Sequence, residues 1–108
     1  MTASAFGVIT TTVSHRGDAE RLADLVLSEK LAACVQILPI ASRYAWKGGV
    51  AREDEWLLLI KTRASLFEKA MARIAAEHPY DIPELVAAPF TAGSPSYLDW
   101  IGQNTLAG

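Results

Sequence analysis

The sequence is poor in the residues that build disulfide frameworks and metal centres. Of its 108 residues, one is cysteine, Cys34, and two are histidine, His15 and His78. A single cysteine excludes an intrachain disulfide framework and is typical of a reducing compartment. No two of these residues have the CxxC, HxxxH or HxH spacing of a zinc site, so one chain alone is not expected to form a complete zinc centre.

Long apolar runs and basic clusters are missing as well. No stretch approaches the ~18 consecutive apolar residues of a membrane helix, and residues 1–5 lack the basic and apolar regions of a signal peptide. Ten Lys and Arg stand against twelve Asp and Glu, without a basic run, which disfavours a nucleic-acid or anionic membrane surface. We therefore expect a cytoplasmic protein with no nucleic-acid or membrane partner.

Apolar residues, in contrast, are abundant for so short a chain. They make up 51% of the sequence, whereas a small domain has much surface and needs polar residues to cover it. Residues 1–108 are long enough for one domain with its own core. The excess of apolar residues suggests that a partner covers part of the surface.

Local patterns predict four strands and three helices. The expected strands cover about 6–13, 33–47, 50–62 and 85–88, and the expected helices cover about 19–31, 66–78 and the residues after Pro95. Ser14 or Asp18 is expected to cap the first helix, and Ser65 with Glu68 has the spacing of a capping box for the second. Pro39 cannot donate a hydrogen bond to a ladder, so it predicts an edge strand or a bulge.

Two long strands are expected to form a hairpin around Lys47-Gly48-Gly49, because paired glycines supply the positive φ of tight turns. The complete order is βαββαβ plus a terminal helix, which predicts an α+β, ferredoxin-like domain. Residues 56–60 are apolar without alternation, so both faces of the sheet should be covered there. The uncovered face is expected to pack against another subunit in a closed homo-oligomer, with the long hairpin between subunits.

Most functions compatible with this topology lack their signature residues. No Lys/Arg-Gly-aromatic motif of an RNA-recognition domain is found, and Ser14-His15-Arg16-Gly17 is a weak match to an anion-binding loop. Cys34 begins an apolar strand and is expected to be a buried structural thiol. Without a nucleophile–base pair, the sequence does not predict an enzyme.

The heptad from His78 to Glu84 combines ionisable, aromatic and proline residues. Pro79 and Pro83 each fix their own φ and favour extended geometry in the preceding residue. The segment is therefore either a stiff connector between the second helix and the fourth strand, or a site.

Five motifs, in order, carry a resemblance to a known family. They are Leu31-Ala32-Ala33-Cys34, Tyr44-x-Trp46-x-Gly48, Glu53-x-Glu55 followed by Lys61-Thr62, His78-Pro79-Tyr80-x-x-Pro83-Glu84, and Tyr97-Leu98-x-Trp100. Over nearly its whole length the sequence resembles the CutA divalent-cation tolerance family. The resemblance implies a ferredoxin-like homotrimer with hairpins embracing neighbouring subunits, similar in organisation to the PII-type signalling proteins. It also implies a role in tolerance to copper and other divalent metals, with no established reaction.

The resemblance also points to candidate metal ligands. Family members credited with copper ligands use a Cys late in the first strand and a His-His pair before Pro-Tyr; here these positions are Thr11 and Glu77-His78. His78 is the one retained soft ligand and Glu77 is a harder oxygen alternative. We expect weak or absent specific copper binding, unless neighbouring chains supply further ligands.

A second hypothesis is a ligand-sensing or scaffold module of the PII type. The family's shared polar residues could line a cleft between subunits; they are matched here by Trp46, Glu55, Lys61, Tyr80 and Glu84. With Lys61 supplying positive charge and the aromatic residues supplying flat surface, this set suits a small anionic or amphipathic ligand. Alternatively, Lys61 forms an intersubunit ion pair with Glu84 or Glu55.

Overall fold

The computed structural model describes residues 2–107 and has the expected α+β architecture. Its strands are β1 (Phe6–Val13), β2 (Cys34–Trp46), β3 (Gly49–Arg63) and β4 (Val86–Pro89). Its helices are α1 (Arg16–Ser28), α2 (Phe67–Glu77) and α3 (Pro95–Gln103). Two short 3₁₀ turns, η1 (Ala3–Ala5) and η2 (Ala64–Leu66), precede β1 and α2.

The four strands form one antiparallel sheet in the order β2-β3-β1-β4. This order, with a helix after β1 and another after β3, is the ferredoxin-like arrangement that the sequence predicts. Pro39 lies in β2, which pairs only with β3 and is an edge strand. Its edge position is therefore confirmed, and the register passes through the Pro39–Trp56 pair without a bulge.

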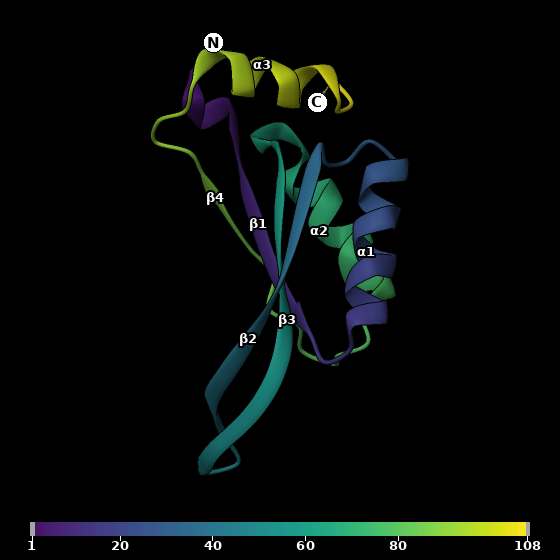
Figure 1. Ribbon diagram of the computed structural model, residues 1–108, viewed down its shortest axis with the longest axis vertical. Coiled ribbons are helices and arrows are strands. Elements are labelled where there is room, and N and C mark those ends of the chain that lie inside the picture. The colour runs from purple at the N-terminus through teal and green to yellow at the C-terminus, as the bar shows by residue number, and fades with distance from the viewer. Residues whose placement is uncertain (1, 108) are drawn as a thin grey trace.

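Helices α1 and α2 cover one face of the sheet, and α3 crosses its end near the N-terminus (Figure 1). The core between the helices and the sheet is apolar; its fully buried members include Ile9, Leu22, Val26, Leu58, Ile60 and Ile74. No helix in residues 2–107 has the length and apolar character needed to span a membrane.

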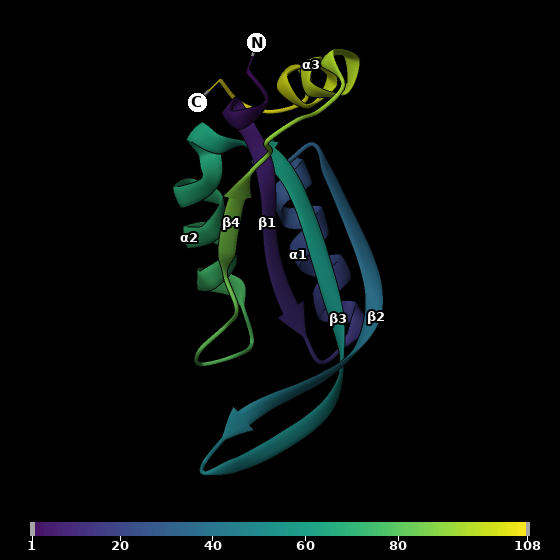
Figure 2. The ribbon, with the colours of Figure 1, turned by 90° about the vertical axis from the view of Figure 1, so that its left-hand side faces the viewer.

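The opposite face of the sheet, which we call the open face, carries no helix over its middle; α3 lies only at its end near the N-terminus, where Leu98 and Ile101 pack on Phe6 (Figure 2). Because side chains alternate along a strand, the register places apolar residues there, among them Val8, Leu38, Leu57, Leu59 and Val86. Leu58 and Ile60 are completely buried under the helices, whereas Leu57 and Leu59 are only partly buried. The apolar run of β3 thus contributes side chains to both faces. Beyond the end under α3, no helix among residues 2–107 covers the open face.

The ends of α1 differ from the prediction. The helix begins at Arg16, and its N-cap residue is His15, which makes no side-chain capping bond; Ser14 and Asp18 do not cap it. It ends at Ser28 instead of Leu31, because Lys30 adopts a φ of 56°. The Leu31 and Lys30 amides then donate to the Val26 and Leu27 carbonyls, at 2.9 and 3.1 Å. This is the bonding of a Schellman ending, in which glycine usually takes the place of Lys30.

The predicted capping box before α2 is also wrong. Turn η2 includes Ser65, and Leu66 is the N-cap residue of α2, without a side-chain capping bond. Helix α2 still buries one apolar side: Ala70 and Ile74 are fully buried, and Phe67 and Met71 are partly buried against the core.

The β2–β3 hairpin extends well past the sheet, and its turn differs in detail from the expected one. Trp46 pairs with Gly49, so the loop is Lys47-Gly48, with φ values of 47° and 80°. Positive φ at both central residues is typical of a type I′ turn. The turn therefore needs one glycine, Gly48, and Gly49 belongs to β3.

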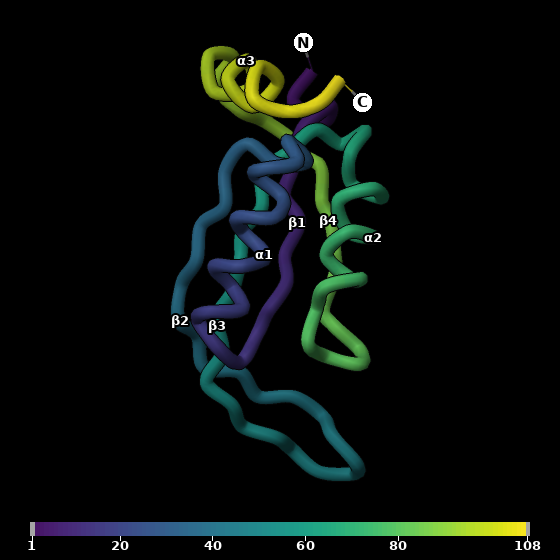
Figure 3. The backbone as a smooth tube through the Cα atoms, turned by 90° about the vertical axis from the view of Figure 1, so that its right-hand side faces the viewer, coloured from purple at the N-terminus to yellow at the C-terminus, as the bar shows by residue number. Residues whose placement is uncertain are grey.

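The heptad from His78 to Glu84 connects α2 to β4, as expected of a stiff connector. Helix α2 ends at Glu77, and β4 begins at Val86, one residue later than predicted, and extends through Pro89. The distal half of the hairpin bends beneath this connector, as two opposite views show (Figure 2 and Figure 3), and residues of both segments line one cavity.

Candidate functional site

His78, the expected metal ligand, is held by hydrogen bonds through both ring nitrogens. Its Nδ1 accepts from the Tyr80 amide at 3.1 Å, so Nδ1 carries no proton. Its Nε2 lies 3.0 Å from the Thr12 carbonyl and 3.0 Å from Thr11 Oγ1. Burial lowers the pKa of His78 below its ordinary range. The ring is therefore a neutral imidazole with an Nε2–H that donates to Thr12.

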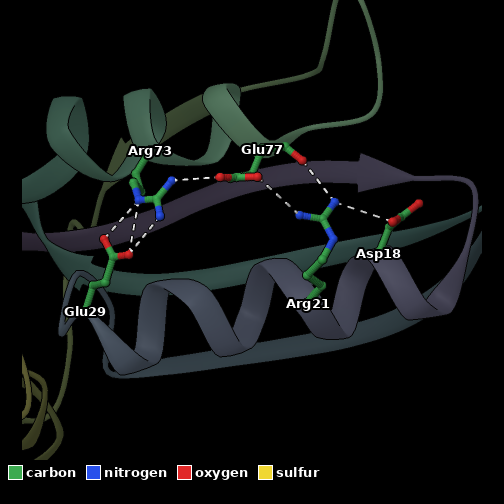
Figure 4. Close-up of polar contacts among 5 residues, drawn as sticks. All are labelled: Asp18, Arg21, Glu29, Arg73 and Glu77. Atoms are coloured by element: carbon green, nitrogen blue, oxygen red, sulfur yellow. Dashed lines mark hydrogen bonds and ion pairs between the residues drawn. The ribbon is translucent and has the colours of Figure 1, made fainter.

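The other two positions of the expected metal site lie on different sides of His78. Thr11 is fully buried and lies in contact with the imidazole. The Glu77 carboxylate instead lies 3.2 Å from Arg73 and 3.8 Å from Arg21, and its carbonyl accepts from Arg21 at 2.9 Å (Figure 4). Within residues 2–107, no three His, Cys, Asp or Glu side chains lie close enough to hold a metal ion.

Four of the five residues expected in a ligand cleft surround one cavity. The space of about 730 Å³ between the bent hairpin and the α2–β4 connector is lined by Trp46, Glu55, Tyr80 and Glu84, and also by Thr12, Ser14, Ser42, Arg43, Tyr44, Glu53, Asp81, Ile82 and Pro83. We call this space the hairpin cleft.

Glu55 lies at the inner wall of the hairpin cleft, with 7% of its surface exposed. Its Oε2 accepts from the Tyr80 hydroxyl at 2.7 Å, and Tyr80 in turn lies 2.6 Å from Ser14 Oγ. Burial and the adjacent Glu55 raise the pKa of Tyr80 to about 12. Tyr80 therefore remains a proton donor, and Ser14 donates to it.

Lys61, the fifth expected residue, does not line the hairpin cleft. It lies near the other end of the open face, where it donates to Gln36 and its ammonium lies 5.9 Å from the centre of the Tyr97 ring. No carboxylate in residues 2–107 pairs with it. The predicted ion pair between Lys61 and Glu55 or Glu84 concerns neighbouring subunits and stays a prediction.

Cys34 is half-buried, whereas the sequence analysis expected a buried thiol. It pairs with Lys61 across β2 and β3, on the open face. Burial and the neighbouring thiol raise the pKa of the Tyr97 hydroxyl. Cys34 thus belongs to a polar group with Lys61 and Tyr97, separate from the hairpin cleft.

Sequence reasoning did not name Ser14, Arg43, Tyr44 or Glu53 as cleft residues. For two of them a signal was present: Tyr44 precedes Trp46 by two positions and Glu53 precedes Glu55 by two. Residues two apart in a strand share a face, and the Ser42–Glu53 register puts both pairs on one side of the hairpin. Ser14 and Arg43 enter the cleft through the bend of the hairpin, which periodicity does not reveal.

Comparison with known proteins identifies the family. Residues 7–104 match the model of the CutA1 divalent ion tolerance protein. The chain belongs to the CutA1 divalent ion tolerance family. A CutA protein of Thermus thermophilus, named a divalent-cation tolerance protein, is 43% identical over 99 residues, which are 91% of this chain and 96% of that protein.

Other relatives of this CutA1-family chain are longer. The Arabidopsis thaliana protein named "Protein CutA, chloroplastic" is 46% identical over 91% of this chain, but the chain spans only 54% of its length. The crystal structure of CutA1 from Oryza sativa superimposes with a TM-score of 0.93 at 41% identity, covering 100% of both chains. The ferredoxin-like fold and the resemblance seen in the sequence are thus both confirmed.

Proposed function

We propose that this chain functions in the response to divalent metal ions, as the name of its family states. The observation that carries the proposal is the family match over residues 7–104, which includes every strand except the first residue of β1. The proposal assigns no catalytic step to the chain. Deletion of the chromosomal copy should lower growth in elevated copper or zinc, and expression of the intact chain should restore it; unchanged growth would contradict the proposal.

The chain is further proposed to act as a homotrimer. Support comes from the middle of the open face, whose apolar side chains no helix among residues 2–107 covers, and from the projecting hairpin (Figure 2). Burial of apolar surface stabilises an assembly by roughly 25 cal/mol per Å² before the costs of association. The number three rests on the family resemblance. Mass measurement in solution at several protein concentrations tests it, and a monomer at every concentration would contradict it.

Within the trimer, His78 is proposed to contribute an imidazole to a weak site for copper or another divalent cation. Within one chain, Glu77 is engaged by two arginines, so further ligands must come from neighbouring chains or water. A metal ion must displace the hydrogen bond between Nε2 and Thr12 or that between Nδ1 and Tyr80. This cost predicts weak affinity.

Calorimetry with Cu(II) on the assembled protein tests the metal site. We expect a dissociation constant weaker than about 1 μM, which His78→Ala weakens further. His15→Ala is the matched control, because His15 is exposed and makes no side-chain hydrogen bond in the described chain. Submicromolar binding that His78→Ala leaves unchanged would contradict the site while leaving the family role intact.

A cytoplasmic location is likewise a proposal. It rests on the single cysteine, which is typical of a reducing compartment. Fractionation of the native host tests it, and recovery outside the cytoplasm would contradict it.

A further inference from the structure

The hairpin cleft gathers acidic side chains that have hydroxyl partners but no cationic partner. Three of its carboxylates each accept one hydrogen bond from a hydroxyl: Tyr80 to Glu55 at 2.7 Å, Tyr44 to Glu53 at 2.8 Å, and Thr10 to Glu84 at 2.9 Å. None of the three forms an ion pair within residues 2–107. Their negative charges are thus oriented but not neutralised.

Glu55 is the exceptional member of this group. The residue is only 7% exposed, and burial of a charge is costly unless hydrogen bonds or a counter-ion compensate it. Only its Oε2 accepts a hydrogen bond from the described residues. The second oxygen, Oε1, belongs to a side chain that lines the cleft and has no protein donor there.

Aromatic rings form the walls beside these carboxylates. Tyr44 and Trp46 make an edge-to-face pair with ring centres 6.3 Å apart, and both are largely exposed. Exposed ring faces attract organic cations through their quadrupole. The ammonium of Lys47 lies 5.7 Å from the centre of the Trp46 ring, but it pairs with none of the carboxylates.

The charge and geometry of the cleft restrict the class of ligand. Glu53, Glu55, Asp81 and Glu84 line it against a single basic residue, Arg43, which disfavours an anion. The expectation of an anionic ligand depended on Lys61, which lies elsewhere. A metal ion requires several converging ligands, and no three suitable side chains in residues 2–107 converge.

We propose that the hairpin cleft binds an organic cation, an ammonium or guanidinium group with apolar carbon attached, and that Glu55 is its counter-ion. The aromatic walls contact the carbon part, and Tyr80 orients the carboxylate. The cation has two possible sources: a free small molecule, or a Lys or Arg side chain of a second copy. This inference does not rest on metal tolerance.

Titration of the assembled protein with defined cations tests the first source. The probes are n-butylammonium and methylguanidinium chloride, with n-butanol and sodium chloride as controls, and the readout is the NMR signals of the Trp46 indole and the Tyr80 amide. We expect saturable shifts with the two organic cations only. Loss of a charged hydrogen bond should weaken binding at least about tenfold in Glu55→Gln.

Glu68→Gln is the matched control, because it removes the same charge from an exposed position on α2, and it should bind like the parent. Binding of n-butanol as tight as that of n-butylammonium, or equal affinity of the two glutamate variants, would overturn the proposal. Should Glu55→Gln fail to fold, Trp46→Ala at the exposed wall replaces it, with a several-fold loss of affinity expected.

A crystal structure of the assembled protein tests the second source when no free cation binds. We then expect a Lys or Arg nitrogen of another copy at ion-pair distance, within 4.0 Å of a Glu55 carboxylate oxygen, and a weaker assembly in Glu55→Gln than in Glu68→Gln. Absence of both free-cation binding and such a side chain would overturn the proposal.

Discussion

Single residues of this chain differ widely in how strongly their surroundings constrain them. At one extreme, a Cβ atom on Gly7 would lie 2.6 Å from Phe67 Cζ and 2.8 Å from Pro89 Cα, and closer still to the Ala88 carbonyl oxygen. Two of these neighbours belong to the β4 backbone, which cannot retreat without breaking its pairing with β1. The absence of a side chain is therefore a requirement at this position.

Gly7→Ala should consequently lower the free energy of unfolding by about 3 kcal/mol. Urea denaturation measures the change. The matched control is Gly17→Ala in α1, where no atom lies within 4 Å of the added Cβ, so a small gain from helix propensity is expected. Equal effects at the two positions would contradict the close approach of β4.

Thr62, in contrast, carries a buried hydroxyl group that the fold does not require. Its Oγ1 is buried without a hydrogen-bond partner among residues 2–107. Thr62→Val replaces the hydroxyl by a methyl group of similar shape and should raise the free energy of unfolding by up to about 1 kcal/mol. Thr11→Val, which removes the hydroxyl next to His78, should lower it instead.

His78 couples stability to pH. Its pKa is lowered by burial, so below about pH 6.5 the unfolded chain binds more protons than the folded chain. The stability that neutral His78 contributes is complete above that value and is lost as the pH falls through the lowered pKa. The stability difference between the parent and His78→Gln should therefore shrink on acidification.

Urea midpoints measured between about pH 7.5 and pH 5 test this dependence. The exposed His15→Gln variant serves as control and should follow the parent across the range. A constant gap between the parent and His78→Gln would contradict the coupling.

At the scale of elements, the two helices are joined by a chain of surface charges. Arg73 on α2 lies 3.1 Å from Glu29 and 3.2 Å from Glu77, and Arg21 on α1 reaches both Glu77 and Asp18 (Figure 4). The nearby carboxylates raise the pKa of Arg73 further above its ordinary range. The chain of charges lies at the surface, where salt screens it.

Arg73→Gln should slightly lower the thermal midpoint, and the loss should shrink in high salt. Thermal melts at low and high sodium chloride concentration measure both effects. Arg16→Gln is the control, because the ion pair of Arg16 with Glu20 lies within α1 and its other contact is with the Trp56 ring, not with α2. A loss that is independent of salt would show that Arg73 acts through packing instead.

The elements were predictable from the sequence, but their ends were less so. Apolar periodicity located all four strands and three helices because burial determines it. Helix α1 ends earlier than predicted because Lys30 adopts a positive φ that glycine usually takes, and the predicted capping box failed because η2 precedes α2. Both depend on tertiary contacts that outweigh local preference.

The site was predictable in part. Trp46, Glu55, Tyr80 and Glu84 line one cleft within a single chain, whereas the family motifs implied a cleft between subunits. Lys61 shares a strand and a face with Glu55 but lies outside the hairpin cleft, because a shared face gives no measure of the distance along the strand. Ser14 and Arg43 were missed because the bend of the hairpin brings them in.

At the scale of the whole molecule, the open face is the surface that the proposed homotrimer would bury. Leu59→Glu places a charge at its centre and should prevent a trimer from forming, because a buried unpaired charge is costly. Solution mass measures the outcome. Leu27→Glu, on the exposed side of α1, should leave the mass unchanged; an unchanged mass in Leu59→Glu would show that this face is not the interface.

The unbroken register of the hairpin also limits how a relative of this chain can change in length. The pairing runs from Cys34–Lys61 to Trp46–Gly49 without a bulge, so one extra residue in either arm would turn every side chain beyond it to the opposite face. Trp46 would leave the cleft after such an insertion in β2, and Glu55 after one in β3. An insertion that spares the cleft must therefore add an even number of residues to each arm.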